Sequence, residues 1–188
     1  KLSSGHIEFI QKRERVETYF NQTYSHGGFT QVNKEQYQKV LNKLKSLGND
    51  KFELTLDLFG GNGELSQALS HYFVIVDLVT KLAKDNISQD LYKEEALEKI
   101  YCALEGKQVH NLIIDPPRSG FKDIPRWIDK FKPNRFIYMS CNPQTFFRDI
   151  HYIRERCTHK IQIEELEVFD FFPSTFHLEI LAIFKKTS

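Results

Sequence analysis

The stretch LTLDLFGGNGELSQALSHY, residues 54–72, begins with a short apolar run, passes through a cluster of glycines, and continues into a segment with helical potential. This order is the first half of a β-α-β unit. Glycines here let the backbone turn sharply and approach a ligand closely. A tight turn without a ligand explains them equally well, because the dinucleotide pattern GxGxxG is incomplete and no GK[ST] follows.

The same alternation continues along the chain on both sides of this stretch. Three further apolar runs follow, YFVIVDLV (72–79), NLIIDPP (111–117) and RFIYMSC (135–141), and helical segments separate or follow them. A helix is also expected to begin at Asn33 and to end at Gly48, since the apolar residues between them recur at helical spacing. Strands that alternate with helices predict a parallel sheet.

The C-terminal part breaks the alternation. IQIEELEVFDFF and FHLEILAIFKK are strand-like and are separated only by PST, which predicts an antiparallel pair. We therefore expect an α/β fold: a twisted, mainly parallel sheet with helices on both faces, in which 54–59 pairs with 111–115 and an antiparallel strand covers 176–186. The interval from Asp77 to Asp90 is short for a crossover helix and a strand, so either the helix is reduced or residues are absent.

Composition limits the function classes. The 188 residues are 40% hydrophobic, which suits one packed domain, and the net charge of +1 gives no large basic field for nucleic acid. Cys102, Cys141 and Cys157 have no CxxC spacing, which argues against a zinc or iron–sulfur site and indicates a reduced, cytoplasmic protein. No apolar stretch is long enough to cross a membrane.

Polar residues at the ends of the apolar runs are the candidate site residues, because ligands of open α/β sheets bind beyond the carboxyl ends of the strands. Asp77 could accept hydrogen bonds from ribose hydroxyls, although a solvated Asp explains it better on its own. Asp115 is projected rigidly by Pro116 and Pro117, and the next residue, Arg118, suits a phosphate or a carboxylate.

Cys141 ends the fourth apolar run, directly before Asn142 and Pro143. A buried structural cysteine is the commonest fate of a free thiol, and that interpretation fits Cys102 and Cys157. Cys141 instead stands beside an expected helix N-terminus, which lowers the pKa of a thiol, so we interpret it as a nucleophile. Glu179 within FHLEILAIF is either a solvated side chain of an alternating strand or a base paired with that nucleophile.

Five motifs together resemble the RNA (uracil-5)-methyltransferase family, which uses S-adenosylmethionine. They are FTQVN (29–33), DLFGGNGELS (57–66), DPPRSG (115–120), SCNPQT (140–145) and FFPSTFHLE (171–179), in the order of the family. The resemblance implies a Rossmann-like class I methyltransferase fold. It also implies that 29–188 is the catalytic domain, and that 1–28 is a linker or the remnant of a preceding RNA-binding part.

The resemblance implies roles for individual residues as well. The adenosylmethionine site would be lined by Gln31, Phe59, Glu64, Asp77 and Asp115. Cys141 would be the nucleophile and Glu179 the proton acceptor, acting on carbon 5 of a uridine in structured RNA, either tRNA or rRNA. No metal and no iron–sulfur cluster is implied for this chain.

Two alternatives stay open. An RNA cytosine-5 methyltransferase would place a cysteine directly after its Asp-x-Pro turn, where this chain has Arg118. A methyltransferase-like domain that binds RNA or cofactor without turnover would not need both Cys141 and Glu179, and the presence of both favours the enzyme.

Overall fold

A seven-stranded sheet organises the chain. The computed structural model describes residues 33–48, 53–78, 87–171 and 178–187. The strands are β1 (Leu54–Leu58), β2 (Tyr72–Asp77), β3 (Ile87–Ser88), β4 (Val109–Ile114), β5 (Arg135–Ser140), β6 (Ile161–Phe169) and β7 (Glu179–Lys186). The helices are α1 (Lys34–Leu47), α2 (Glu64–Leu69), α3 (Ala96–Ala103), α4 (Ile124–Phe131) and α5 (Pro143–Arg156).

The strand order is β3-β2-β1-β4-β5-β7-β6, and the predicted pairings are confirmed. β1 pairs in parallel with β4, with Leu58 opposite Ile114. β7 runs antiparallel to both β5 and β6. The expected fold class, a mainly parallel sheet that finishes with antiparallel strands, is therefore correct.

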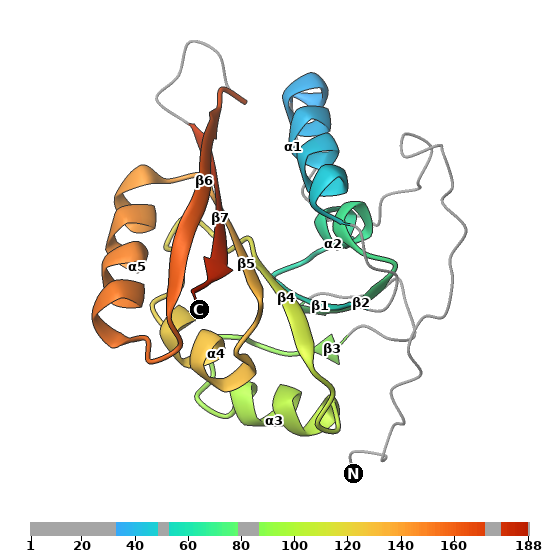
Figure 1. Ribbon diagram of the computed structural model, residues 1–188, viewed down its shortest axis with the longest axis vertical. Helices are drawn as coiled ribbons and strands as arrows, with labels where there is room; N and C mark the ends of the chain where they lie inside the picture. The colour runs from blue at the N-terminus through green and yellow to red at the C-terminus, as the bar shows by residue number, and fades with distance from the viewer. Residues whose placement is uncertain (1–32, 49–52, 79–86, 172–177, 188) are drawn as a thin grey trace.

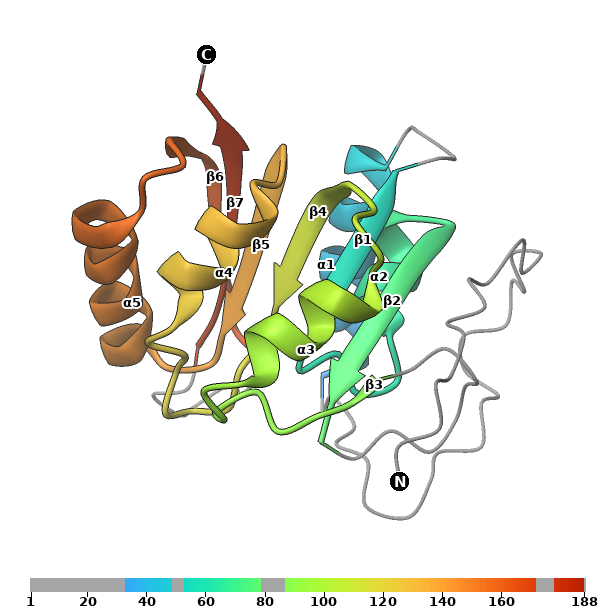
Figure 2. The same ribbon diagram turned by 90° about the horizontal axis from the view of Figure 1, so that it is seen from below.

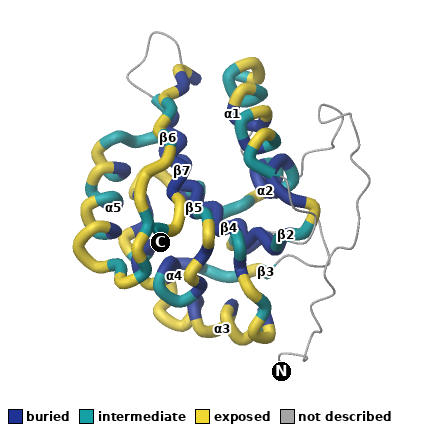
Figure 3. Tube along the Cα trace, in the orientation of Figure 1, coloured by how far each residue is buried: buried dark blue, intermediate teal, exposed yellow. Residues whose placement is uncertain are grey.

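Helices cover both faces of the sheet, with α1 and α2 on one face and α3, α4 and α5 on the other (Figures 1 and 2). Each face has its own core. Val40 and Leu44 of α1 pack with Ile137 and Leu181 on the first face. The second core is larger and includes Trp127 of α4. Both cores form because the continuous apolar runs of the strands place apolar side chains on both faces of the sheet. In Figure 3 the inner strands are largely buried, whereas β6 at one side of the sheet is mostly exposed.

Two boundaries differ from the expectation. β5 ends at Ser140, so Cys141 is the first residue after the strand rather than its last. β7 begins at Glu179, whereas the expected strand began at residue 176. Within the short interval after Asp77, the further strand exists as the two-residue β3, which pairs in parallel with β2. Residues 79–86 lie outside the described ranges, as do 1–32, which include the expected linker.

No helix in the described part of the chain combines the length and the apolar character that a membrane span requires.

Phe146 and Phe147, neighbours on α5, provide a matched test of the second core. Phe146 is 1% exposed and its ring stacks on Tyr138 at 5.4 Å, whereas Phe147 is 63% exposed. Phe146→Ala should lower the free energy of unfolding by about 3–5 kcal/mol, since it removes a buried ring. Phe147→Ala should change it by less than about 0.5 kcal/mol. Urea denaturation measures both, and equal losses would contradict this assignment of the core.

Candidate active site

Strand pairing brings the motif residues to one edge of the sheet. β1, β4 and β5 are adjacent and parallel, so their carboxyl ends lie together. β7 is antiparallel to β5 and pairs Ile180 with Ser140. Continuing that register by one residue places Glu179, the first residue of β7, opposite Cys141. The two residues that sequence analysis paired therefore meet because one strand ends where its neighbour begins.

The glycine-rich turn after β1 requires its glycines. Gly61 and Gly63 have φ angles of 51° and 73°, in the left-handed region that favours glycine. A Cβ on Gly60 would lie 2.7 Å from Cγ of Asp57, and a Cβ on Gly63 would lie 2.2 Å from Cδ1 of Ile75. The turn is thus closely packed from below, and its backbone stays open above.

Hydrogen bonds join this turn to the next strand. Gly61 donates its N–H to Oδ2 of Asp77 over 3.0 Å, and the N–H of Phe59 donates to the carbonyl of Val76 over 2.8 Å. Phe59 has a φ of 60°, and its ring packs 5.1 Å from that of Phe121. Two predicted cofactor residues, Phe59 and Asp77, are therefore fixed on opposite sides of one turn.

Asp57 lies beneath the turn, and its carboxyl group is buried without a well-formed hydrogen bond. Its side chain is fully buried, and neither carboxylate oxygen has a hydrogen-bond partner among the described residues. Burial raises the pKa of Asp57 to about 7, Ser66 opposes the rise through its hydroxyl and its backbone N–H, and the charges of Asp115 and Asp77 add to it. A buried carboxyl is unfavourable in its charged form, so a cation or a further donor at this end of the sheet would stabilise that form.

Asp115 adds a further carboxyl to this edge of the sheet, and its charge acts on both Asp57 and Cys141. We call the end of the sheet that carries Asp57, Asp77, Asp115 and Glu179 the acidic edge. Burial raises the pKa of Asp115 to about 8, with Glu179 as the second cause. Burial likewise raises the pKa of Glu179 to about 7, and Arg118 opposes the rise. Glu179 is 4% exposed, so it is a buried acid that can exchange a proton near neutral pH. The interpretation of Glu179 as a solvated side chain is therefore wrong.

Cys141 lies between opposing charges. The helix N-terminus follows it as expected, since the side chain of Asn142 caps α5 by accepting the N–H of Gln144 over 3.0 Å and Pro143 opens the helix. The expected lowering of the thiol pKa is wrong, because burial and the charge of Glu179 raise it. Arg118 acts against both through a hydrogen bond to the thiol and its positive charge.

Two residues act at this edge in ways that sequence analysis did not predict. The sequence indicated only that Arg118 suits a phosphate or a carboxylate, yet Arg118 favours the charged forms of both Cys141 and Glu179. Tyr37 is one of the residues whose helical spacing predicted α1, yet burial and the charge and hydrogen bond of Glu64 raise the pKa of its hydroxyl. Nothing in the spacing of Tyr37 distinguishes it from a core residue, so no sequence signal could have found it.

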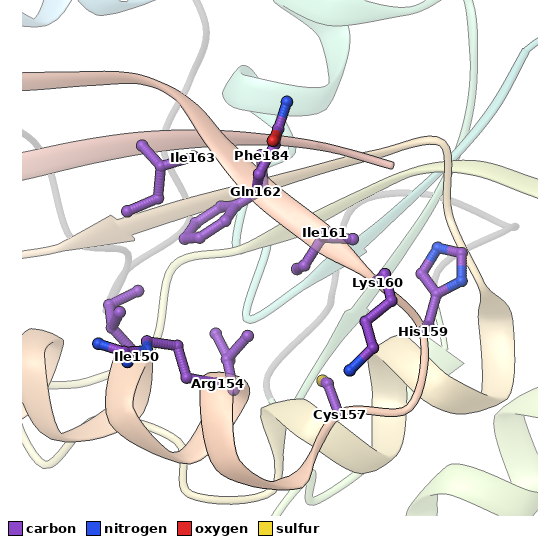
Figure 4. A pocket seen from close by; sticks show the side chains of 10 residues that line it. Ile150, Arg154, Cys157, His159, Lys160, Ile161, Gln162, Ile163 and Phe184 are labelled. Carbon is purple, nitrogen blue, oxygen red and sulfur yellow. The ribbon is translucent and has the colours of Figure 1, made fainter. Parts of the chain in front are cut away.

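The structure brings together Phe59, Glu64, Asp77, Asp115, Cys141 and Glu179 at this edge. Gln31 lies outside the described residues. A separate cavity of about 370 Å³ lies between the last turn of α5 and the start of β6 (Figure 4). Its lining includes Arg154, Cys157 and Lys160, from the opposite end of these elements, so the cavity is distinct from the candidate site.

A family model described as tRNA (Uracil-5-)-methyltransferase matches residues 93–187, which is just over half of the chain. These residues include Asp115, Arg118, Cys141 and Glu179. The chain belongs to the tRNA (uracil-5-)-methyltransferase family.

Curated relatives of this family member match almost the whole chain. The 23S rRNA (uracil(1939)-C(5))-methyltransferase RlmD of Shewanella sp. strain MR-4 is 29% identical over 176 residues, covering 87% of this chain and 38% of that protein. The enzyme of the same name from Shewanella sp. strain W3-18-1 is 31% identical over 180 residues, covering 88% and 39%. The chain thus spans about two fifths of the length of these relatives.

Solved structures confirm the fold. The tRNA (uracil-54, C5)-methyltransferase of Pyrococcus abyssi, in complex with S-adenosyl-L-homocysteine, has a TM-score of 0.59 at 24% identity and covers 84% of this chain and 40% of that one. The E. cuniculi Mtq2–Trm112 complex, which methylates the eRF1 termination factor, has a TM-score of 0.52 at 14% identity, with coverage of 81% and 96%. The same fold therefore serves RNA and protein substrates, so the fold alone does not specify the substrate.

Among the residues that the structure describes, no three His, Cys, Asp or Glu side chains converge as metal ligands would.

Glu179→Gln should make Cys141 more reactive, because it removes a charge that raises the thiol pKa. The gain should appear above pH 7, where Glu179 is ionised, and should vanish at pH 6, where Glu179 is protonated and resembles Gln. The measurement is the rate of alkylation of Cys141 by iodoacetamide, followed by peptide mass mapping. Glu164→Gln on β6 is the control and should leave the rate unchanged.

Proposed function

We propose that this family member is the catalytic domain of an S-adenosylmethionine-dependent methyltransferase that methylates carbon 5 of a uridine in structured RNA. The observation that supports it most is the strand register that sets Cys141 against Glu179, beside the glycine-rich turn. A thiol nucleophile and a base are the two groups that methylation of uracil at carbon 5 requires. The names of the relatives, which specify uracil in rRNA or tRNA, agree with it.

The residues at the edge fit S-adenosylmethionine. This cofactor carries a sulfonium and an ammonium, and it supplies an electrophilic methyl group when bound. Asp57, whose buried oxygens have no donor among the described residues, and Asp115 offer negative charge to those cations. Gly61 has open space where a Cβ would stand, so the turn leaves room for a ligand beside its backbone. We propose Gln31, Phe59, Glu64, Asp77 and Asp115 as the cofactor-binding set, with Tyr37 holding Glu64.

The residues of this chain then have separate tasks. Carbon 5 of uracil is a poor nucleophile until Cys141 Sγ forms a bond to carbon 6, which places electron density on carbon 5. After carbon 5 has gained the methyl group, Glu179 removes its remaining proton, and the electrons of that bond expel Cys141 Sγ from carbon 6. Arg118 supports the thiolate before attack and after release. Cys141 therefore begins and ends the cycle unchanged.

The substrate base must leave its stack to reach this edge, since carbon 6 is inaccessible in a stacked helix. We propose tRNA or rRNA as the RNA, because the family description prints the first and the curated relatives print the second. A reducing, cytoplasmic setting belongs to the same proposal, since the three cysteines are free and Cys141 must stay a thiol.

Cofactor binding should depend on pH in a way that reports the acidic edge. Asp57 and Asp115 have pKa values of about 7 and about 8, so both gain charge between pH 6 and pH 8.5. Affinity for S-adenosylmethionine should therefore rise relative to S-adenosylhomocysteine, whose sulfur is neutral, by on the order of tenfold. Calorimetry at the two pH values measures this ratio. It should depend less on pH in Asp115→Asn, and a ratio independent of pH in the unmodified chain would contradict the electrostatic fit.

Replacing the two catalytic candidates should give different outcomes. Cys141→Ala should abolish methyl transfer and leave adenosylmethionine binding nearly intact, because the thiol contacts the base and not the cofactor. Glu179→Gln should allow attack and methylation but stall proton removal, so that RNA remains covalently attached through Cys141. The measurement is a protein–RNA band that survives denaturing electrophoresis, made with the longest natural chain that contains this sequence.

The matched control is the double variant Cys141→Ala, Glu179→Gln, in which the band should vanish. Methyl transfer by Cys141→Ala would exclude the uracil-5 mechanism. Normal turnover by Glu179→Gln would place the base elsewhere. Cofactor binding without any methylation of tRNA or rRNA would favour the alternative of a binding domain.

A further inference from the structure

Asp149 on α5 is a buried charge that the proposed chemistry does not use. Its side chain is 0% exposed. Oδ2 accepts the hydroxyl of Tyr138 over 2.7 Å and the backbone N–H of Phe121 over 2.8 Å. Oδ1 accepts hydrogen bonds from Nε and Nη2 of Arg148 over 2.9 and 2.6 Å. Both oxygens are satisfied, in contrast to those of Asp57, so the charge is held in one defined place.

The partners of Asp149 belong to three different elements. Tyr138 is on β5, Arg148 is the neighbouring residue on α5, and Phe121 ends the turn that follows the Asp-Pro-Pro-Arg motif. Arg148 Nη2 also donates to the carbonyl of Ser119 over 2.8 Å. A single ion pair therefore joins the helix after Cys141 to the turn after Arg118.

Gly120 allows this close approach. It has a φ of 70°, and a Cβ at this position would lie 2.4 Å from Oδ2 of Asp149 and 2.5 Å from Nη2 of Arg148. Only a residue without a side chain lets the ion pair reach the backbone of the turn. The glycine of DPPRSG is thus explained by the helix that packs against it.

The same helix holds Arg118 directly. The carbonyl of Arg118 accepts hydrogen bonds from Nδ2 of Asn142 and from Oγ1 of Thr145, each over 3.2 Å. Asn142 is the residue after Cys141 and caps α5. The backbone that carries the guanidinium and the backbone that carries the thiol are therefore parts of one hydrogen-bonded unit, which Asp149 closes at its far end.

We propose that Asp149 is a positioning residue, which together with Arg148 fixes the 118–121 turn on α5 and so holds Arg118 in place beside Cys141. The assignment rests on the proposed function only in giving Cys141 the role of nucleophile. Glu179, Asp115 and Arg118 are the charged groups that act on Cys141. Arg118 alone among these three lowers its pKa, so displacement of Arg118 raises the thiol pKa further.

The experiment is Asp149→Asn, read as the rate of alkylation of Cys141 by iodoacetamide from pH 6.5 to 10, with peptide mass mapping. The amide keeps the size of the carboxyl but has no negative charge, and its NH2 group cannot accept the two hydrogen bonds that one of the Asp149 oxygens accepts. We expect the pH profile of Cys141 to move upward and its rate at pH 8 to fall by roughly threefold to tenfold, as for a shift of half to one pKa unit. Cys102 and Cys157, read in the same samples, should not change.

Asp129→Asn is the matched control for loss of a structural carboxylate. Asp129 on α4 accepts hydrogen bonds from the N–H groups of Thr158 and His159 over 2.9 and 2.7 Å, so it also ties a helix to a turn. That turn follows the C-terminal end of α5, whereas Cys141 precedes the N-terminal end. Asp129→Asn should lower the melting temperature and leave the Cys141 profile unchanged. A purely structural Asp149 would give the same result, and that outcome would overturn the proposal.

Arg118→Gln separates the positioning role from other effects. By itself, Arg118→Gln should move the pH profile of Cys141 alkylation to higher pH. Adding Asp149→Asn should move the profile little further, since both changes act through one guanidinium. Additive shifts would contradict the proposal. If Asp149→Asn does not fold, Tyr138→Phe removes one hydrogen bond to Asp149 and should move the profile in the same direction by less; an unchanged profile there would also overturn it.

The readout is independent of methylation. Should Cys141→Ala retain methyl transfer while Asp149→Asn shifts the thiol, the positioning role stands and the proposed function falls. Should Asp149→Asn leave the pH profile of the thiol unchanged while Cys141→Ala abolishes methyl transfer, the positioning role falls and the proposed function stands.

Discussion

The antiparallel pairing of β7 with β5 is the constraint on which the site depends. In a wholly parallel sheet, the strand beside β5 would end at the same edge, and its last residue would lie beside Cys141. Here the strand begins at that edge, so its first residue, Glu179, takes the place. The apolar residues that follow Glu179 are buried in both cores. A slip of one residue would exchange the faces of the whole strand, so packing along β7 fixes the position of the proposed base.

Burial gives this edge its acid–base character. Asp57, Asp115 and Glu179 have pKa values raised to about 7, about 8 and about 7, each mainly by desolvation. A carboxyl whose folded pKa is raised favours folding when protonated, so its contribution is fully present below an unfolded pKa of about 4 and is lost as pH rises through the folded value. At neutral pH the ligand-free domain therefore carries unfavourable charge. A cation bound at the edge offsets it, which links ligand affinity to the same burial that weakens the free domain.

Sequence analysis predicted most of the fold because the apolar runs are continuous and their connections are short. The β1–β4 pairing followed from the alternation of strands with helices, and the antiparallel β7 followed from the two C-terminal runs that break this alternation. The direction of the Cys141 pKa could not be predicted, since a helix N-terminus is visible in the sequence whereas burial and the distance to Glu179 are not. Glu179 was ambiguous for the same reason: alternation along a strand does not say which face is covered. The roles of Gln31 and of residues 1–28 stay predictions.

Arg118 has two opposing effects on the proposed nucleophile. A guanidinium beside a thiol favours the thiolate, but it also favours the charged form of Glu179, which in turn disfavours the thiolate. The two effects are compatible only if the guanidinium lies close to both groups at once, and a flexible loop would not keep it there. Three features restrict the turn. Asp149, paired with Arg148, accepts the N–H of Phe121, and Asn142 and Thr145 donate hydrogen bonds to the carbonyl of Arg118. Gly120 has no side chain, so α5 can approach the backbone of the turn closely. The four hydrogen bonds that Asp149 accepts offset the cost of burying its charge, and the turn that they fix is the one that carries Arg118.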